Sequence, residues 1–323
     1  MQGPAVQGST DVADAVAYRP LLFSIAYGMT GSVGDAEDIV QDAFLGLTKA
    51  HRAGTEIAAP KAYLTTSVTR LGINHLSSAR VRRETYVGEW LPEPVVVSGE
   101  RPGPVEHAEL ADSLSMAFLV LLEALSPVER AVFMLREVFG YEYPQVARST
   151  GKSEANCRQI FARARKRIAA GGWADEAGPA ADGPPPPARR AEGEELARTF
   201  FEAAAGGEMD ALLDMLAPDV VYHGDGGGKA RAVAKSVTEP HRVGQLLIGG
   251  LRRLRSLGAS LRPALVNGRP GALIVDAEGR VASVVELEIA DGVVRAVHTV
   301  SNPDKLGHLG PVSDIGRLPE KGA

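Results

Sequence analysis

The chain has 323 residues, which is enough for two or three domains that each bury a core of their own. Its net charge of −5 and its pI near 5.9 exclude a uniformly basic nucleic-acid-binding protein, so any DNA contact must come from a local basic surface. The single cysteine excludes a disulfide framework and a thiolate metal site. We expect no metal and no cofactor.

The amino-terminal residues MQGPAVQGSTDVADAV lack the basic start and the apolar run of a secretory signal. No stretch of the chain reaches about 18 uncharged apolar residues, the length needed to cross a bilayer. The sequence therefore predicts a cytoplasmic protein with no membrane partner.

The first segment after the amino terminus is predicted to be helical. Apolar residues at positions 36, 39, 40, 43, 44 and 47 follow the spacing of a helix that buries one side. A second helix is expected from about 60 to 78, followed by a basic segment with arginines at 80, 82 and 83. The outer side of the first helix carries an acidic ridge, which consists of Asp35, Glu37, Asp38, Gln41 and Asp42.

Two segments rich in proline interrupt the chain, at 86–106 and at 171–193, and the second contains GPPPP at 183–187. Both are predicted to be linkers because Pro and Gly oppose helix and sheet alike. Residues 107–170 between them are predicted to be helical, and Ser126-Pro127 with Glu129 marks a helix start there.

Residues 143–170 predict a helix-turn-helix, in which Gly151 supplies the turn and Ser153 caps the second helix. A spacing of 100° per residue gathers Cys157, Phe161, Ala164 and Ile168 on one side of that helix. The opposite face carries Ala155, Asn156, Gln159, Arg163 and Lys166, with Arg158 on the flank. Amide and guanidinium groups match base edges in the major groove, so this face is predicted to bind DNA. The alternative is a solvated basic helix in some other all-α domain.

The pattern changes in the last third of the chain. Residues 194–216 are predicted to be helical, and from about 260 onward strands such as ALIVD, ASVVELEI and VVRAVHTV are expected. The dipeptides at 267–268, 278–279 and 291–292, each ending in Gly, predict hairpin turns between strands. Together these features predict an α+β domain with a curved antiparallel sheet covered by helices.

Two long segments resemble a known family. Residues 18–50, YRPLLFSIAYGMTGSVGDAEDIVQDAFLGLTKA, resemble region 2 of the bacterial extracytoplasmic-function sigma factors, and residues 125–168 resemble their region 4. Three shorter motifs, WLPEP at 90–94, DGGGK at 225–229 and NPDKL at 302–306, resemble the SigJ-type subgroup, in which a SnoaL-like domain follows region 4.

The resemblance implies a multidomain, non-enzymatic transcription initiation factor with two all-α sigma domains and an α+β SnoaL-like cone-shaped domain. The implied partners are RNA polymerase core, through its β′ clamp helices and β flap, and promoter DNA. The expected boundaries are 12–85 for sigma region 2, 86–106 for a linker with WLPEP, 107–170 for sigma region 4, 171–193 for a Pro-rich linker, 194–306 for the SnoaL-like regulatory domain and 307–323 for a tail.

The resemblance also implies roles for single residues. The acidic ridge would bind the polymerase, and the segment from Tyr63 to Arg83 would open the minus-10 element. Tyr63 stands where Trp is frequent, and Ile160 stands where Arg is frequent, which would remove a DNA contact. We expect Arg158 and Gln159 to select bases. The full DNA-binding set is Asn74, Arg80, Arg82, Arg83, Ser153, Asn156, Arg158, Gln159, Arg163 and Lys166.

The three short motifs are expected to form a regulatory contact. An exposed Trp90 beside Leu91 would be costly, so this pair is predicted to pack on another part of the chain. A tethered contact needs little affinity to stay closed, so no separate anti-sigma factor is expected. The residues of the contact are Trp90, Leu91, Pro92, Glu93, Asp225, Gly226, Gly227, Gly228, Lys229, Asn302, Pro303, Asp304, Lys305 and Leu306.

Two alternatives remain at this point. One is a one-component regulator that binds an operator without polymerase and senses a ligand through its last domain, although such a regulator has no use for an acidic docking helix. The other is a SnoaL-like isomerase with a DNA-binding appendage, for which the resemblance implies His223, Asp225 and His298 as the candidate catalytic set. We favour the interpretation in which the two histidines are ordinary residues of a sheet face. Asp225 then begins a tight glycine turn that presents Lys229 to another domain.

Overall fold

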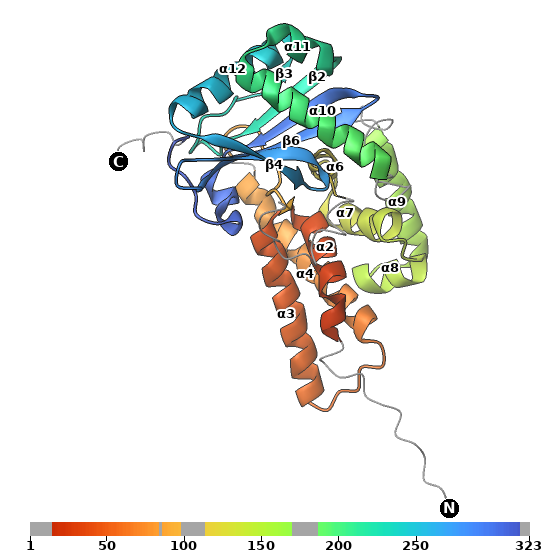
Figure 1. Cartoon of the computed structure of the whole chain (residues 1–323). Coiled ribbons are helices and arrows are strands. Elements are labelled where there is room, and N and C mark those ends of the chain that lie inside the picture. Colours follow the sequence, from red (N-terminus) through yellow and green to blue (C-terminus); the bar gives the residue numbers. More distant parts are fainter. Residues whose placement is uncertain (1–14, 84–85, 98–113, 170–186, 317–323) are drawn as a thin grey trace, which may run out of the picture. The chain divides into compact units, whose positions relative to one another are not determined.

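The computed structural model describes residues 15–83, 86–97, 114–169 and 187–316, without the side chains of 79–83 and 187–189. The chain divides into two compact units, and many of their elements are labelled in Figure 1. Unit 1 consists of Met1–Arg80 and Leu122–Gly172, and unit 2 consists of Val81–Leu121 and Trp173–Ala323.

Unit 1 begins with η1 (Val16–Tyr18), α2 (Arg19–Thr30), α3 (Val33–Arg52) and α4 (Pro60–Arg83). The side chain of Ser32 caps α3 by accepting a hydrogen bond from the backbone N–H of Asp35 at 3.1 Å. The predicted apolar stripe of α3 is buried except for Phe44, which is partly exposed. The predicted helix from 60 to 78 is present and continues five residues further.

The second half of unit 1 contains α7 (Pro127–Phe133), the π-helix η2 (Met134–Val138), α8 (Tyr143–Thr150) and α9 (Glu154–Ile168). The preceding helix α6 (Met116–Leu122) belongs to unit 2 except for Leu122. Ser126 and Glu129 form the two reciprocal hydrogen bonds of a capping box, which confirms the predicted start of α7. Arg130 is buried and donates to the carbonyl oxygens of Met29 at 2.7 Å and Leu122 at 3.0 Å. This side chain therefore fixes α7 to α2.

The described part of unit 2 contains one mixed sheet, three α-helices after residue 186, most of α6 and two short 3-10 helices. The strands lie in the order β1-β4-β5-β6-β7-β2-β3. The predicted strands and hairpins after residue 260 are present, and both Asn267 and Asp291 adopt the positive φ that precedes glycine in tight hairpin turns. The elements are α10 (Pro187–Gly206), α11 (Met209–Met215), β2 (Leu216–Asp225), β3 (Val237–Thr238), α12 (Pro240–Ser256), β4 (Ser260–Val266), β5 (Arg269–Val275), β6 (Val281–Ala290), β7 (Val293–Val300), η4 (Pro303–Lys305) and η5 (Gly307–Leu309).

Three features of unit 2 differ from the sequence predictions. Helix α10 begins at Pro187 rather than at 194, because proline is tolerated in the first turn of a helix. Residues Val96–Val97, predicted to lie in a linker, form the edge strand β1 against β4. The sheet is also not wholly antiparallel, because β2 and β7 pair in parallel. Parallel pairing joins strands far apart in sequence and leaves no turn signal.

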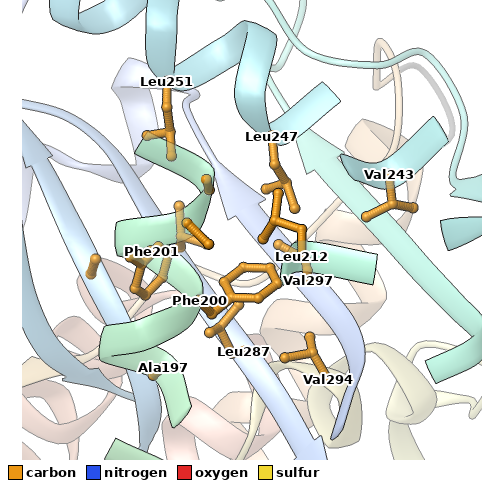
Figure 2. Close-up of a cluster of buried hydrophobic side chains, with 14 of the residues drawn as sticks. Ala197, Phe200, Phe201, Leu212, Val243, Leu247, Leu251, Leu287, Val294 and Val297 are labelled. Atoms are coloured by element: carbon orange, nitrogen blue, oxygen red, sulfur yellow. The ribbon is translucent and has the colours of Figure 1, made fainter. Parts of the chain in front are cut away.

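One face of the sheet is covered by α10, α11 and α12 (Figure 1). Phe200, Leu212, Leu247, Leu287 and Val297 meet in the layer between these helices and the sheet, as Figure 2 shows. Apolar side chains therefore occupy the interior of this face. A cavity of about 540 Å³ lies toward the sheet edge, between α10 and the strands β4 and β5.

The other face of the sheet is covered by segments that are distant in sequence. Residues 86–97, here called the strap, pack there together with the first turns of α6 and residues 303–312. Because side chains alternate along a strand, His298 lies on this second face while its neighbour Val297 lies on the first. The apolar part of the second face consists of Leu91, Met116, Val266, Val275, Val281, Val284, Val300 and Leu306.

Candidate functional site

One buried carboxylate at the end of β2 binds two residues of the strap. Asp225 is completely buried and accepts hydrogen bonds from the Tyr86 hydroxyl at 2.5 Å and from the Leu91 backbone N–H at 2.9 Å. Its Oδ2 atom also lies 2.6 Å from Nζ of Lys305, which follows β7. Three segments of unit 2 therefore meet at one buried charge.

Lys305 completes this site from the carboxyl-terminal side. Its ammonium group lies 4.4 Å from the centre of the Trp90 ring and 4.8 Å from that of the Tyr86 ring, and it donates to the carbonyl oxygen of Leu91. Asn302 donates to the Tyr86 hydroxyl at 2.8 Å. A cation beside a carboxylate and over two aromatic faces is well compensated for its burial.

Burial raises the pKa of Tyr86, and the hydrogen bond to Asp225 and the charge of that carboxylate raise it further. The hydroxyl therefore stays protonated and donates to the carboxylate at any physiological pH. Removal of either partner would leave a polar group without the hydrogen bond that compensates its burial.

The glycine turn after Asp225 is sterically required. Gly227 has a φ of +56°, and a Cβ atom added there would come within 2.2 Å of Asn302 Nδ2. Its N–H also donates to Asp225 Oδ1 at 3.0 Å. A side chain at this position would be strained and would displace the NPDKL segment.

Further contacts hold the rest of the strap. Glu89 Oε1 lies 2.6 Å from Nδ1 of His223, and the carbonyl oxygen of Pro94 lies 2.8 Å from Nε2 of His308. The backbone of Val95 exchanges hydrogen bonds with Asn267, at 2.8 and 3.1 Å. Asn267 also donates to the carbonyl oxygen of Leu114 at 2.8 Å, so it holds both ends of the segment between the strap and α6.

The predicted recognition helix is α9 of unit 1, and it buries Cys157, Ile160 and Ala164. The predicted outer face is exposed at Ala155, Gln159, Arg163 and Lys166, with Asn156 partly exposed. Ser153 accepts from the N–H of Asn156 at 3.2 Å, which confirms it as the N-cap.

The structure adds an observation on each of two recognition-helix residues. Ile160, which stands where Arg is frequent, is only 5% exposed and packs inside unit 1, so its side chain does not belong to the outer face of α9. Arg158 is exposed but engaged: it lies 3.3 Å from Glu154 and its guanidinium lies 4.8 Å from the centre of the Tyr143 ring.

Two carboxylates of the acidic ridge on α3 form ion pairs within unit 1, and the other residues of the ridge are exposed. Glu37 forms an ion pair with Arg19, and the Asp35 carboxylate lies 3.2 Å from Nε2 of His75. Asp38, Gln41 and Asp42 are exposed and lie on one side of the helix. Leu45, which is 47% exposed, lies at the same angle around the helix.

The predicted minus-10 helix α4 is partly covered by α8. Arg70 donates to the backbone carbonyl oxygens of Arg148 at 3.0 Å and Ser149 at 3.4 Å, so it caps the end of α8. Asn74 is exposed. The side chains of Arg80, Arg82 and Arg83 lie outside the described residues, as do the GPPPP segment up to 186 and residues 317–323 of the tail.

Comparison with known proteins places these surfaces in a family. The sequence profile described as Sigma-70 region 2 matches residues 15–82, and that of Sigma-70, region 4 matches residues 115–168. The ECF RNA polymerase sigma factor SigJ of Mycobacterium tuberculosis is 37% identical over 304 residues, which cover 92% of this chain and 93% of the relative. This chain belongs to the extracytoplasmic-function sigma factors.

Other comparisons agree with this assignment. The crystal structure of Mycobacterium tuberculosis SigJ superposes with a TM-score of 0.71 at 33% identity, and the match covers 94% of this sigma factor and all of the SigJ chain. The sigma factor SigG of the same organism is 26% identical, over 88% of this chain and 78% of its own length. The sigma factor therefore has helical regions 2 and 4 followed by a SnoaL-like domain that contains the sheet.

The structure brings together most of the residues that the three motifs predicted for a regulatory contact. Trp90, Leu91, Asp225, Asn302 and Lys305 meet directly, and Lys229 pairs with Asp304 at 2.5 Å on the exposed rim. Sequence reasoning missed Tyr86, Glu89 and Asn267. Tyr86 carried one usable signal, since it is a second aromatic residue four positions before Trp90 in a segment predicted to be a linker.

In the part of the sigma factor that the structure describes, no helix is both long and apolar enough to cross a membrane. Nor do three or more His, Cys, Asp or Glu side chains gather there in an arrangement that could hold a metal ion.

Two buried acid–base groups lie side by side under the strap. His298 stacks on His223 with ring centres 5.0 Å apart, and burial, aided by His223, lowers its pKa to about 3. Glu286 is fully buried, accepts from the N–H of Met116 at 3.2 Å and has its pKa raised to about 8 by burial. Both groups are therefore held neutral near pH 7.

We predict that Glu286 makes unit 2 less stable as the pH rises from 6.5 to 8. In this window the folded chain keeps a proton that the unfolded chain releases, so the free energy of unfolding falls by about 1.4 kcal/mol per pH unit, about 2 kcal/mol in all. His298 opposes this loss by only about 0.4 kcal/mol, because the unfolded chain releases the half proton that it holds at pH 6.5 while the folded side chain is neutral throughout. The measurement is urea unfolding followed by tryptophan fluorescence at pH 6.5 and 8.

The variant Glu286→Gln keeps an acceptor for Met116 but cannot titrate, so its stability should be nearly the same at the two pH values. The exposed Glu278→Gln variant serves as the control and should keep the pH dependence of the original chain. An equal loss of stability in Glu286→Gln would show that another group titrates.

Proposed function

We propose that this sigma factor directs promoter-specific initiation through regions 2 and 4, and that its own SnoaL-like domain controls this activity by holding the strap. The observation that carries the proposal is the binding of Tyr86 and Leu91 to the buried carboxylate of Asp225. A buried charge that receives donors from a distant segment specifies one docked arrangement of that segment.

The position of the strap in the chain suggests how control operates. The strap follows α4 of region 2. Leu114 lies just before α6 of region 4, and Met116 is the first residue of that helix. Contacts with Asp225, Asn267 and Glu286 tie both ends of this connection to one sheet. A docked strap therefore restricts how far regions 2 and 4 can separate, and release of the strap removes that restriction.

We further propose that the SnoaL-like domain is a docking domain and not an enzyme. Asp225 is bound to the strap and to Lys305, and His298 is buried against His223 and neutral, so none of these candidate catalytic groups is left to meet a substrate. Because the controlling element is tethered, its effective concentration is high and no separate anti-sigma factor is required.

A truncation before Asn302 tests this control. It removes Asn302 and Lys305 from the site, so we expect promoter-dependent run-off transcription with core polymerase to rise several-fold. A truncation after Gly316 keeps every described contact and should transcribe like the full chain. Equal transcription from all three chains would contradict control by the SnoaL-like domain. Binding of an operator without any association with core polymerase would instead support a one-component regulator.

A further inference from the structure

A basic segment of the SnoaL-like domain is not used by the docking site. Residues 226–275 contain nine Lys and Arg residues and a single acidic residue, Glu239, although the whole chain carries a net charge of −5. Four of the arginines lie on α12, which contains no Asp or Glu. A local excess of positive charge in an acidic protein indicates a surface selected for an anionic partner.

The arginines of α12 are arranged on its outer side. The helix buries Val243, Gly244, Leu247, Ile248 and Leu251 against unit 2. A spacing of 100° per residue places Arg242, Arg252 and Arg253 opposite that buried side, within an arc of about 100°. All three side chains belong to exposed residues. We call these three residues the α12 arginine face.

The surface between these arginines is formed by small or uncharged residues and is open to solvent. Gly249 lies between Arg242 and Arg252 on the same side of the helix, and a Cβ atom added there would meet nothing within 4 Å. Gln245 and Ser256, which complete this side, are uncharged. From Arg242 to Arg253 the face extends for about 16 Å at 1.5 Å per residue.

Internal ion pairs do not account for this face. Arg242 pairs with Glu239 at 3.2 Å, but both side chains are more than 60% exposed, so this pair contributes little. Among the residues that the structure describes, no carboxylate lies within ion-pair distance of Arg252 or Arg253. The helix dipole favours Arg253 in the last turn, but it disfavours a cation such as Arg242 in the first turn.

We propose that the α12 arginine face binds the phosphate backbone of duplex DNA, as a contact in addition to regions 2 and 4. Arginine matches phosphate through two parallel hydrogen bonds, and a convex helix with small residues between its cations can approach a duplex closely. Such a contact is independent of base sequence and of strap docking.

The test compares full-length double variants in DNA binding across a range of salt concentrations. Fluorescence anisotropy would give the affinity for a labelled promoter duplex and for a labelled duplex of unrelated sequence. Arg252→Gln with Arg253→Gln should weaken both by about tenfold at 0.1 M salt and reduce the salt slope by about 1 to 2, since each lost phosphate contact removes about 0.9.

The matched control is Arg198→Gln with Arg295→Gln, which removes the same charge from arginines paired with carboxylates in unit 2. Its affinity and slope should stay close to those of the original chain. If both double variants lost the same DNA affinity, the loss would be due to net charge and not to the α12 arginine face, and the proposal would be overturned. Unchanged DNA binding in the Arg252 and Arg253 variant would also overturn the proposal. A fall in the affinity for core polymerase with unchanged DNA binding would overturn it too, because the face would then bind a protein and not DNA. The unrelated duplex keeps this test separate from promoter recognition.

Discussion

Replacement of Asp225 by alanine is expected to release the strap from the SnoaL-like domain. The change removes the acceptor of Tyr86 and Leu91 and leaves Lys305, which is 7% exposed, buried without its carboxylate. Removal of one partner of a buried ion pair costs about 3 to 5 kcal/mol. We therefore expect a large loss in the free energy of unfolding of unit 2 and rapid proteolysis within residues 86–97. If the strap controls activity, run-off transcription should rise in the same variant.

The control for this experiment is Asp304→Ala, which removes the pair with Lys229. Both side chains of that pair are more than half exposed, so the expected cost is at most about 1 kcal/mol. A strap that stays protected from protease in Asp225→Ala would contradict the view that this carboxylate holds it. A released strap with unchanged transcription would separate docking from control.

Reversal of charge at Asp38 and Asp42 is expected to weaken binding of core polymerase by at least about tenfold. These two carboxylates are exposed four residues apart on α3, and exposed Leu45 follows at a similar angle around the helix, so together they form an acidic surface with an apolar side chain at one end. The structure favours this pair over Glu37, because Glu37 is engaged by Arg19. The double variant Asp38→Lys with Asp42→Lys would be measured by equilibrium binding to core polymerase.

Asp210 and Asp214 supply a matched control, since they are also exposed and four residues apart on a helix, α11. Reversal of their charge should leave polymerase binding unchanged. Equal weakening by both double variants would mean that net charge, and not the face of α3, determines the affinity.

Sequence reasoning predicted best what is determined locally. The apolar spacing of α3, the capping box of α7 and the hairpin turns at Asn267 and Asp291 each depend on residues a few positions apart, and each is present in the structure. The resemblance to sigma factors then supplied the order of the domains. Together these features predict the fold class without reference to any tertiary contact.

Contacts between distant residues could not be derived in this way. The parallel pairing of β2 with β7 and the addition of β1 to β4 join strands more than 70 residues apart. Tyr86 and Glu89 have meaning only because Asp225 and His223 lie opposite them in the folded chain. Likewise the predicted apolar side of α9 did not include Ile160, which packing within unit 1 buries.

The short strand β1 also decides what the edge of the sheet can do. While Val96 and Val97 pair with Val266 and Leu265, part of β4 is covered by the chain itself. A strap that leaves would expose those backbone N–H and C=O groups, and an open sheet edge is the feature through which separate protein molecules add strands to one another. The docked strap thus protects the molecule from self-association, and a permanently released form would carry an aggregation hazard along with any gain in activity.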